Sequence, residues 1–139
     1  AVLFIIILIC FKVAVPLTFL FAPIGILSLI MLGLMFGILL TPLGILYQDF
    51  GKGIMIITSL WFFLTPIVYP PPTSFPANMI TKLNPVSPLL VTTRDWLTIG
   101  SVEHLSGFII VTVITFILTL MGWIFYRISM PHLIARLGA

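Results

Sequence analysis

Charged residues are scarce in this chain of 139 residues, of which they make up 6%. Three carboxylates, Asp49, Asp95 and Glu103, stand against six lysines and arginines. Soluble domains have about 25% charged residues, whereas this chain is 61% hydrophobic with a mean hydropathy of +1.35. The balance excludes an ordinary soluble domain and predicts an integral membrane protein. Because the basic residues are scattered singly, we expect no nucleic-acid partner.

The same scarcity removes most enzymatic chemistry. The expected topology separates Asp49 from the other two carboxylates, so no general acid/base pair is available. His104 and His132 also fall on opposite sides and lack metal-ligand spacing. The chain has no GxxxxGK[ST] phosphate loop, and its single cysteine, Cys10, has no partner for a disulfide. We therefore expect no catalytic residues, no metal and no cofactor in this chain.

Long apolar runs separated by short polar breaks predict an all-α polytopic membrane protein, because a span needs about 20 apolar residues. The sequence begins within an apolar run, so we expect a fragment with three full transmembrane helices and the end of a fourth. The single transmembrane domain 1–139 divides into a partial span at 1–11, spans at 17–46, 53–69 and 106–126, short gate-like helices within 76–99, and a cytoplasmic tail at 127–139.

Small residues mark two faces for helix packing. Gly33 and Gly37 form a small-xxx-small pair, which lets another helix approach, either within the chain or in a dimer. Thr112, Thr115 and Thr119 make a weakly polar stripe on the last span. We expect this stripe to face protein or a water-lined path, although each threonine can also bond its own preceding turn.

The stretch 61–97 departs from this spanning pattern. Pro66 predicts a kink at the exit of an aromatic span, and a proline run follows. Two short helices come next, at 76–83 and 88–99, divided by Asn84-Pro85. They measure about 12 and 18 Å, against about 30 Å of hydrocarbon. They must lie in the interface, dip in and return, or pack against protein.

The second short helix carries its own start and stop signals. Ser87 and Pro88 form a favourable N-cap and first-turn pair, and Gly100 is a plausible stop. Its residues separate into two faces, which predicts an amphipathic helix. One face carries Leu89, Leu90, Thr93, Trp96 and Leu97, and the other carries Thr92, Asp95 and Thr98.

Aromatic residues gather at the outer end of the kinked span. They form either an interfacial aromatic belt or part of a substrate path, on which rings stack against sugar faces or acyl chains. The path candidates are Trp61, Phe62, Phe63, Tyr69 and Trp96.

Several motifs in order resemble a known family. They are a Tyr-x-Asp loop at 47–49, FFLTPIVYP at 62–70, LNPVSPLL at 83–90, Arg94 ten residues after Asn84, and a last span closing on Gly122 and Phe125-Tyr126-Arg127. From 17 to the C-terminus the chain resembles the ABC-2 type permeases, in particular the exporters of O-antigen, capsule and teichoic-acid polysaccharides. One departure is Gln48, where the family loop commonly has arginine.

The resemblance implies a six-span subunit that works as a homodimer in the bacterial cytoplasmic (inner) membrane. It is a transporter subunit and not an enzyme, since ATP and Mg would be bound by a separate ATP-binding cassette partner. The expected substrate is a lipid-linked glycan. Membrane lipids are expected as further partners. The outer gate would include Pro66, Asn84, Pro85 and Arg94. The number of basic residues is three on each side of the membrane, so the positive-inside rule gives no orientation. The resemblance places the tail in the cytoplasm.

Individual roles keep their alternatives. The loop with Tyr47 and Asp49 faces the ATPase or is a solvated turn. Arg94 meets phosphate, or snorkels without a specific partner. The whole chain could instead belong to an ABC-2 drug or lipid exporter, to a structural assembly, or to a membrane-embedded transferase. A transferase would depend on Asp95, Glu103 and His104.

Overall fold

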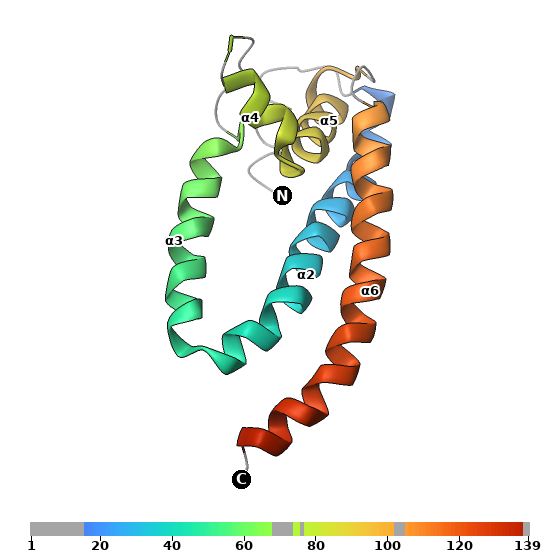
Figure 1. Ribbon diagram of the computed structural model, residues 1–139. Helices are drawn as coiled ribbons and strands as arrows, with labels where there is room; N and C mark the ends of the chain where they lie inside the picture. Colours follow the sequence, from blue (N-terminus) through green and yellow to red (C-terminus); the bar gives the residue numbers. More distant parts are fainter. Residues whose placement is uncertain (1–15, 68–73, 76, 102–104, 138–139) are drawn as a thin grey trace, which may run out of the picture.

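The computed structural model describes residues 16–67, 74–75, 77–101 and 105–137, and every regular element within these ranges is a helix (Figure 1). This confirms the predicted all-α class. The predicted partial span at 1–11 lies outside the described residues. The elements in chain order are the 3-10 helix η1 (Leu17–Phe21) and the α-helices α2 (Ala22–Leu46), α3 (Gln48–Leu64), α4 (Ala77–Leu83), α5 (Val86–Thr98) and α6 (Leu105–Leu137).

Two helical segments are long and apolar enough to cross a membrane, Leu17–Leu46 and Leu105–His132. Only 22% and 17% of their apolar windows are buried, whereas the core helix of a soluble protein is mostly covered by its neighbours. Large apolar side chains therefore stand exposed along both segments. An apolar exposed surface of this extent is typical of contact with lipid or with further protein.

The third predicted span is shorter than a full crossing and differs in its bounds. α3 begins at Gln48 and not at Gly53, because the chain reverses at Tyr47 alone and the expected loop is wound into the helix. It ends at Leu64, two residues before Pro66, whose ring cannot continue the helical hydrogen bonds. Its 17 residues measure about 25 Å. Two candidate spans are therefore present, and a third full span stays a prediction.

The expected tail is a continuation of the last helix. α6 runs through Arg127 and Pro131 to Leu137, so most of 127–139 is helical. Pro131 removes one backbone hydrogen bond from the helix interior, as Pro42 does in α2. Figure 1 shows the last part of each helix turning aside from the axis of the part before it. A proline inside each helix accounts for this change of direction.

The core lies where α5 packs against the two long helices. α2 and α6 pack along each other, and α5 contacts both, together with η1 and α4. Leu89 is completely buried, and the Trp96 ring lies 5.0 Å from the Phe108 ring and 5.9 Å from the Phe21 ring, measured between centroids. The buried cluster comprises Leu32, Met35, Leu89, Trp96 and Phe108.

The threonine stripe of α6 is partly buried. Thr115 is buried, and two turns further on a Cβ added at Gly122 would stand 3.2 Å from a Leu39 methyl group of α2. The Thr119 hydroxyl donates to the Thr115 carbonyl over 2.7 Å, while the buried Thr112 hydroxyl has no partner. Thr119 thus bonds its own preceding turn and Thr115 is buried, while a packing role for the whole stripe stays a prediction.

Candidate functional site

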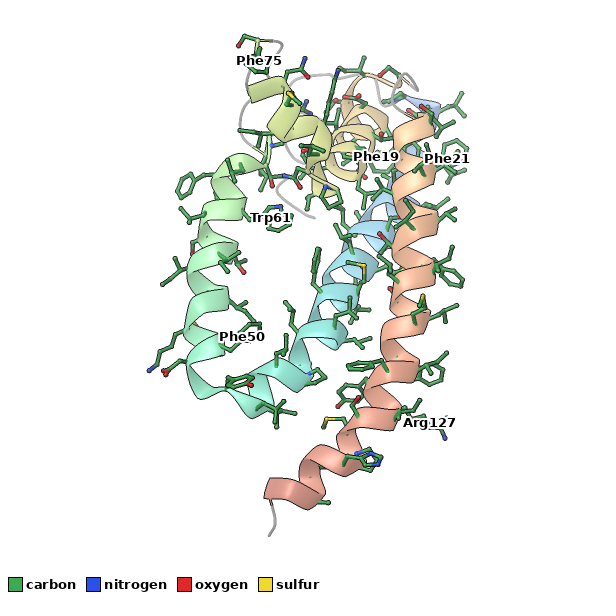
Figure 2. The ribbon with its side chains drawn as sticks, in the orientation of Figure 1. Phe19, Phe21, Phe50, Trp61, Phe75 and Arg127 are labelled. Atoms are coloured by element: carbon green, nitrogen blue, oxygen red, sulfur yellow. The ribbon has the colours of Figure 1, made fainter. Side chains whose placement is uncertain are left out.

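The candidate site is a polar junction between the end of α3 and the break that separates α4 from α5 (Figure 2). Asn84 occupies the break and is buried. Its Oδ1 accepts hydrogen bonds from Trp61 Nε1 and from the Val86 amide, both at 3.0 Å. Its Nδ2 donates to Thr65 Oγ1 over 2.8 Å. The Asn84 side chain thus bonds the end of α3 to the start of α5, directly after the end of α4.

The local sequence explains why Asn84 takes this place. Its amide donates to the Ile80 carbonyl and closes α4, while its carbonyl accepts from the Ser87 amide. Asparagine oxygens readily accept from the backbone two residues on, and Pro85 has no amide to compete. α5 consequently begins at Val86, and Ser87 lies inside the helix with its buried hydroxyl unpartnered. The predicted Ser87 cap is therefore wrong, because Asn84 meets the first amides.

Thr65 is a member of the junction that the sequence prediction missed. It is buried, accepts from Asn84 and donates to the Trp61 carbonyl over 2.9 Å. The signal was a hydroxyl directly before Pro66, at the end of the helix, where a threonine can bond the carbonyl four residues back. Trp61 completes the arrangement by placing its ring edge-on to Phe36 of α2, with centroids 5.8 Å apart.

The other aromatic path candidates divide between an exposed surface and the core. Phe62 and Phe63 are exposed and line a shallow hollow of about 690 Å³ along α3, together with Thr58 and Ser59. Tyr69 lies outside the described residues. Trp96 is 4% exposed and packs in the core. Because its ring is covered within the chain, the assignment of Trp96 to an open path is wrong.

α5 also differs from the amphipathic helix that its pattern predicts. Thr92 and Asp95, assigned to the polar face, are buried, whereas Thr98 is exposed and Arg94 is half-buried. The reason is the surroundings, since α5 is inserted among η1, α2, α4 and α6. Thr18 of η1 donates to the Trp96 carbonyl over 3.1 Å. Of the three placements expected for a short helix, α5 takes packing against protein.

α5 ends as its sequence predicts. The amides of Ile99 and Gly100 both donate to the Asp95 carbonyl, and Gly100 has a φ of +82°. This left-handed conformation favours glycine at a helix end. A side chain at Gly100 would also meet Pro16, because an added Cβ would stand 2.9 Å from the Pro16 Cβ.

The residues predicted for the aqueous loop lie at the far end of α3 from the junction. Asp49 is exposed in the first turn, where a carboxylate is favourable to the helix dipole, and Lys52 Nζ lies 3.2 Å from its Oδ1. Tyr47 is exposed at the reversal between α2 and α3. One helix therefore joins the exposed acidic turn to the buried Asn84 junction.

The glycine pair of α2 is open within this chain. No neighbouring atom lies within 4 Å of a Cβ added at Gly33 or Gly37. Both line an open hollow of about 470 Å³, to which α6 contributes Tyr126. The close approach inside the chain is instead at Gly25, where an added Cβ would collide with Thr93 of α5. A role for the pair in packing against another chain stays a prediction.

The described residues contain no group of three or more histidine, cysteine, aspartate or glutamate side chains placed to hold a metal ion. Asp95 is buried in α5, and the other two transferase candidates, Glu103 and His104, lie outside the described ranges. The chemistry of the junction is neutral hydrogen bonding. Comparison of the chain with protein-family models, curated proteins and solved structures gives no match.

Proposed function

We propose that the chain is part of the permease subunit of an ATP-driven ABC exporter, which moves a lipid-linked polysaccharide or glycolipid across the bacterial cytoplasmic membrane. A separate ATP-binding cassette subunit supplies the ATP hydrolysis, and a second permease copy completes the path. The motifs at 47–49, 62–70 and 83–90 provide the family resemblance. The arrangement of α3 and the short helices supports the proposal further.

The observation that carries the proposal is the contrast between the two ends of α3. Its start is exposed, whereas its end is hydrogen-bonded to the short helices. At its start, Asp49 and Lys52 are exposed and bonded only to each other in the described structure. At its end, Trp61 and Thr65 are bonded to Asn84. A continuous helix of this kind moves as a rigid element, so a displacement at the acidic turn reaches the short helices directly.

The proposed mechanism follows from this connection. ATP binding in the partner subunit shifts the turn at Tyr47 and Asp49, and α3 passes the shift to the Asn84 junction. The junction then moves the break between α4 and α5. Phe62 and Phe63, exposed on the same helix, offer broad and weakly directional contact to a sliding sugar or acyl chain.

The decisive experiment is purification of the full-length protein in mild detergent, followed by mass spectrometry. A stoichiometric ATP-binding subunit together with a bound lipid-linked glycan is the expected result. A bound lipid without sugar would shift the proposal to a drug or lipid exporter. A preparation with no ATPase partner and no ATPase activity would overturn the exporter.

A functional variant pair tests whether the exposed rings of α3 guide the substrate. Phe63→Ala should lower export at unchanged protein level, because it removes an exposed ring from the hollow on α3. Met55→Ala, which removes an apolar side chain from the same hollow but no ring, is the matched control. Equal export by both variants would exclude ring stacking as a guide for the substrate.

A further inference from the structure

α4 is oriented inside-out compared with a helix on a water-facing surface. Its apolar residues point outward, since Met79, Ile80 and Leu83 are 55%, 43% and 78% exposed. Its polar side is turned inward: Thr81 is buried, and Asn84 just after the helix is buried in the junction. Phe75, two residues before the start of α4, is 80% exposed as well. Water would disfavour this arrangement, because the exposed groups are the apolar ones.

The place of α4 in the fold indicates what covers this surface. Figure 1 shows α4 at the same end of the molecule as η1 and the first turn of α6. Both candidate membrane spans begin there, at Leu17 and Leu105. With α2 and α6 across a bilayer, α4 would lie at the level where the hydrocarbon gives way to the headgroups.

Lys82 adds a charge in the position that this boundary favours. It is exposed, in the last turn of α4. At 100° per residue it falls at the border of the apolar side, between Met79 and Asn78. A lysine there can lay its aliphatic stem along the apolar surface and hold its ammonium group among lipid phosphates. A second copy of the same surface would bring two such lysines together, which favours lipid as the occupant.

We propose that Phe75, Met79, Ile80 and Leu83 form a lipid-binding face on α4. This α4 lipid face enters the boundary between acyl chains and headgroups, and Lys82 contacts lipid phosphate. α4 and α5 then have different surroundings, since α5 packs on protein and α4 rests on the bilayer. Because Asn84 directly follows α4, the lipid face holds one side of the junction at a set depth. The proposal requires that α2 and α6 cross the bilayer, but it does not require transport.

Spin-label accessibility in lipid nanodiscs tests the α4 lipid face on the full-length protein with Cys10→Ser and any other native cysteine replaced. Labels are attached in separate variants at Met79→Cys and Leu83→Cys. Ile114→Cys, exposed within the α6 span, serves as the hydrocarbon reference. Lys52→Cys, exposed near the turn, serves as the aqueous reference. Collision with oxygen is compared with collision with a water-soluble nickel chelate.

We expect the oxygen-to-nickel ratio at Met79 and Leu83 to be several-fold higher than at Lys52 and to approach that at Ile114. A ratio equal to that at Lys52 would place the face in water and overturn the proposal. Low collision with both reagents, with magnetic coupling between copies, would show a second chain and also overturn it. If α6 does not cross the bilayer, the oxygen-to-nickel ratio at Ile114 would be as low as that at Lys52, which distinguishes this outcome from the others. Two independent label positions keep the test valid if one variant does not fold.

Discussion

The two ends of the molecule are held by different kinds of interaction. At the short-helix end, formed by η1, α4, α5 and the end of α3, hydrogen bonds join residues far apart in sequence, such as Thr18 to Trp96 and Trp61 to Asn84. At the turn end, formed by Tyr47, the start of α3 and the end of α6, the described side-chain bonds stay within one helix. Lys52 bonds Asp49, and His132 bonds the Ile128 carbonyl.

This difference arises because the polar groups are buried at the short-helix end and exposed at the turn end. A buried amide or hydroxyl without a partner is costly, so Asn84 and Thr65 hold their positions only if several helices are correctly placed. Exposed groups near the turn find water or their own helix. The short-helix end should therefore be sensitive to single substitutions, and the turn end should tolerate them.

The largest effect is expected for Gly25→Leu. The new side chain would enter the space of Thr93, whose Cγ2 stands 2.8 Å from an added Cβ. Overpacking costs about 1–3 kcal/mol and occasionally more, and we expect the upper part of this range in the free energy of unfolding, measured by denaturing-detergent titration. Gly33→Leu should leave the free energy of unfolding unchanged, because no neighbouring atom lies within 4 Å of a Cβ added at Gly33. Equal losses for both would contradict the packing of α5 on α2.

Asn84→Ala should rank second. Trp61, Thr65 and the Val86 amide would all lose a buried partner. A buried group left unsatisfied costs about 1–3 kcal/mol, and we expect a loss of about 2–3 kcal/mol by the same titration. Thr98→Ala, which removes an exposed hydroxyl bonded to its own helix, is the control. If Asn84→Ala were as stable as the control, the junction would not hold α3 to the short helices.

Gly100→Ala should have an intermediate effect. An alanine at a φ of +82° is strained and would press on Pro16. The loss should exceed about 1 kcal/mol. Gly53→Ala in α3 has open space and should instead raise stability by about 0.5–1 kcal/mol, since alanine favours a helix interior. Thermal melting in micelles compares the two, and the same sign for both would contradict the positive φ at Gly100.

The smallest effect is expected for Asp49→Asn at the turn end. Both side chains of its pair are largely exposed, 94% for Asp49 and 82% for Lys52, and exposed ion pairs contribute about 0–1 kcal/mol. We expect a slightly larger fall in melting temperature than for Lys52→Gln, because Asp49 also interacts favourably with the helix dipole, and a smaller change at high salt. Under the proposed function, Asp49→Asn should nevertheless lower export. A stability loss as large as that of Asn84→Ala would show that the turn is held by further contacts.

The sequence predicted the elements better than their surroundings. The 17–46 helix, the break at Asn84-Pro85 and the stop at Gly100 depend on local properties: apolar length, missing proline amides and a positive φ. The start of α3 was missed because Gln48, Asp49 and Lys52 are polar and suggest a loop, although polar residues can still form a helix. Thr65 was missed because its role depends on an asparagine that follows nineteen residues later.

The sequence by itself determined an all-helical, strongly apolar chain with two short helices after a proline run. It also predicted three full spans, of which the structure shows two candidates. The physical reason is local, since hydropathy, helix length and proline geometry act within a few residues. Only the tertiary structure decided that Trp96 is buried, that Asn84 and not Ser87 meets the start of α5, and that α4 turns its apolar side outward. Those outcomes depend on which helices surround each face, because a buried polar group goes where partners from other helices can meet it.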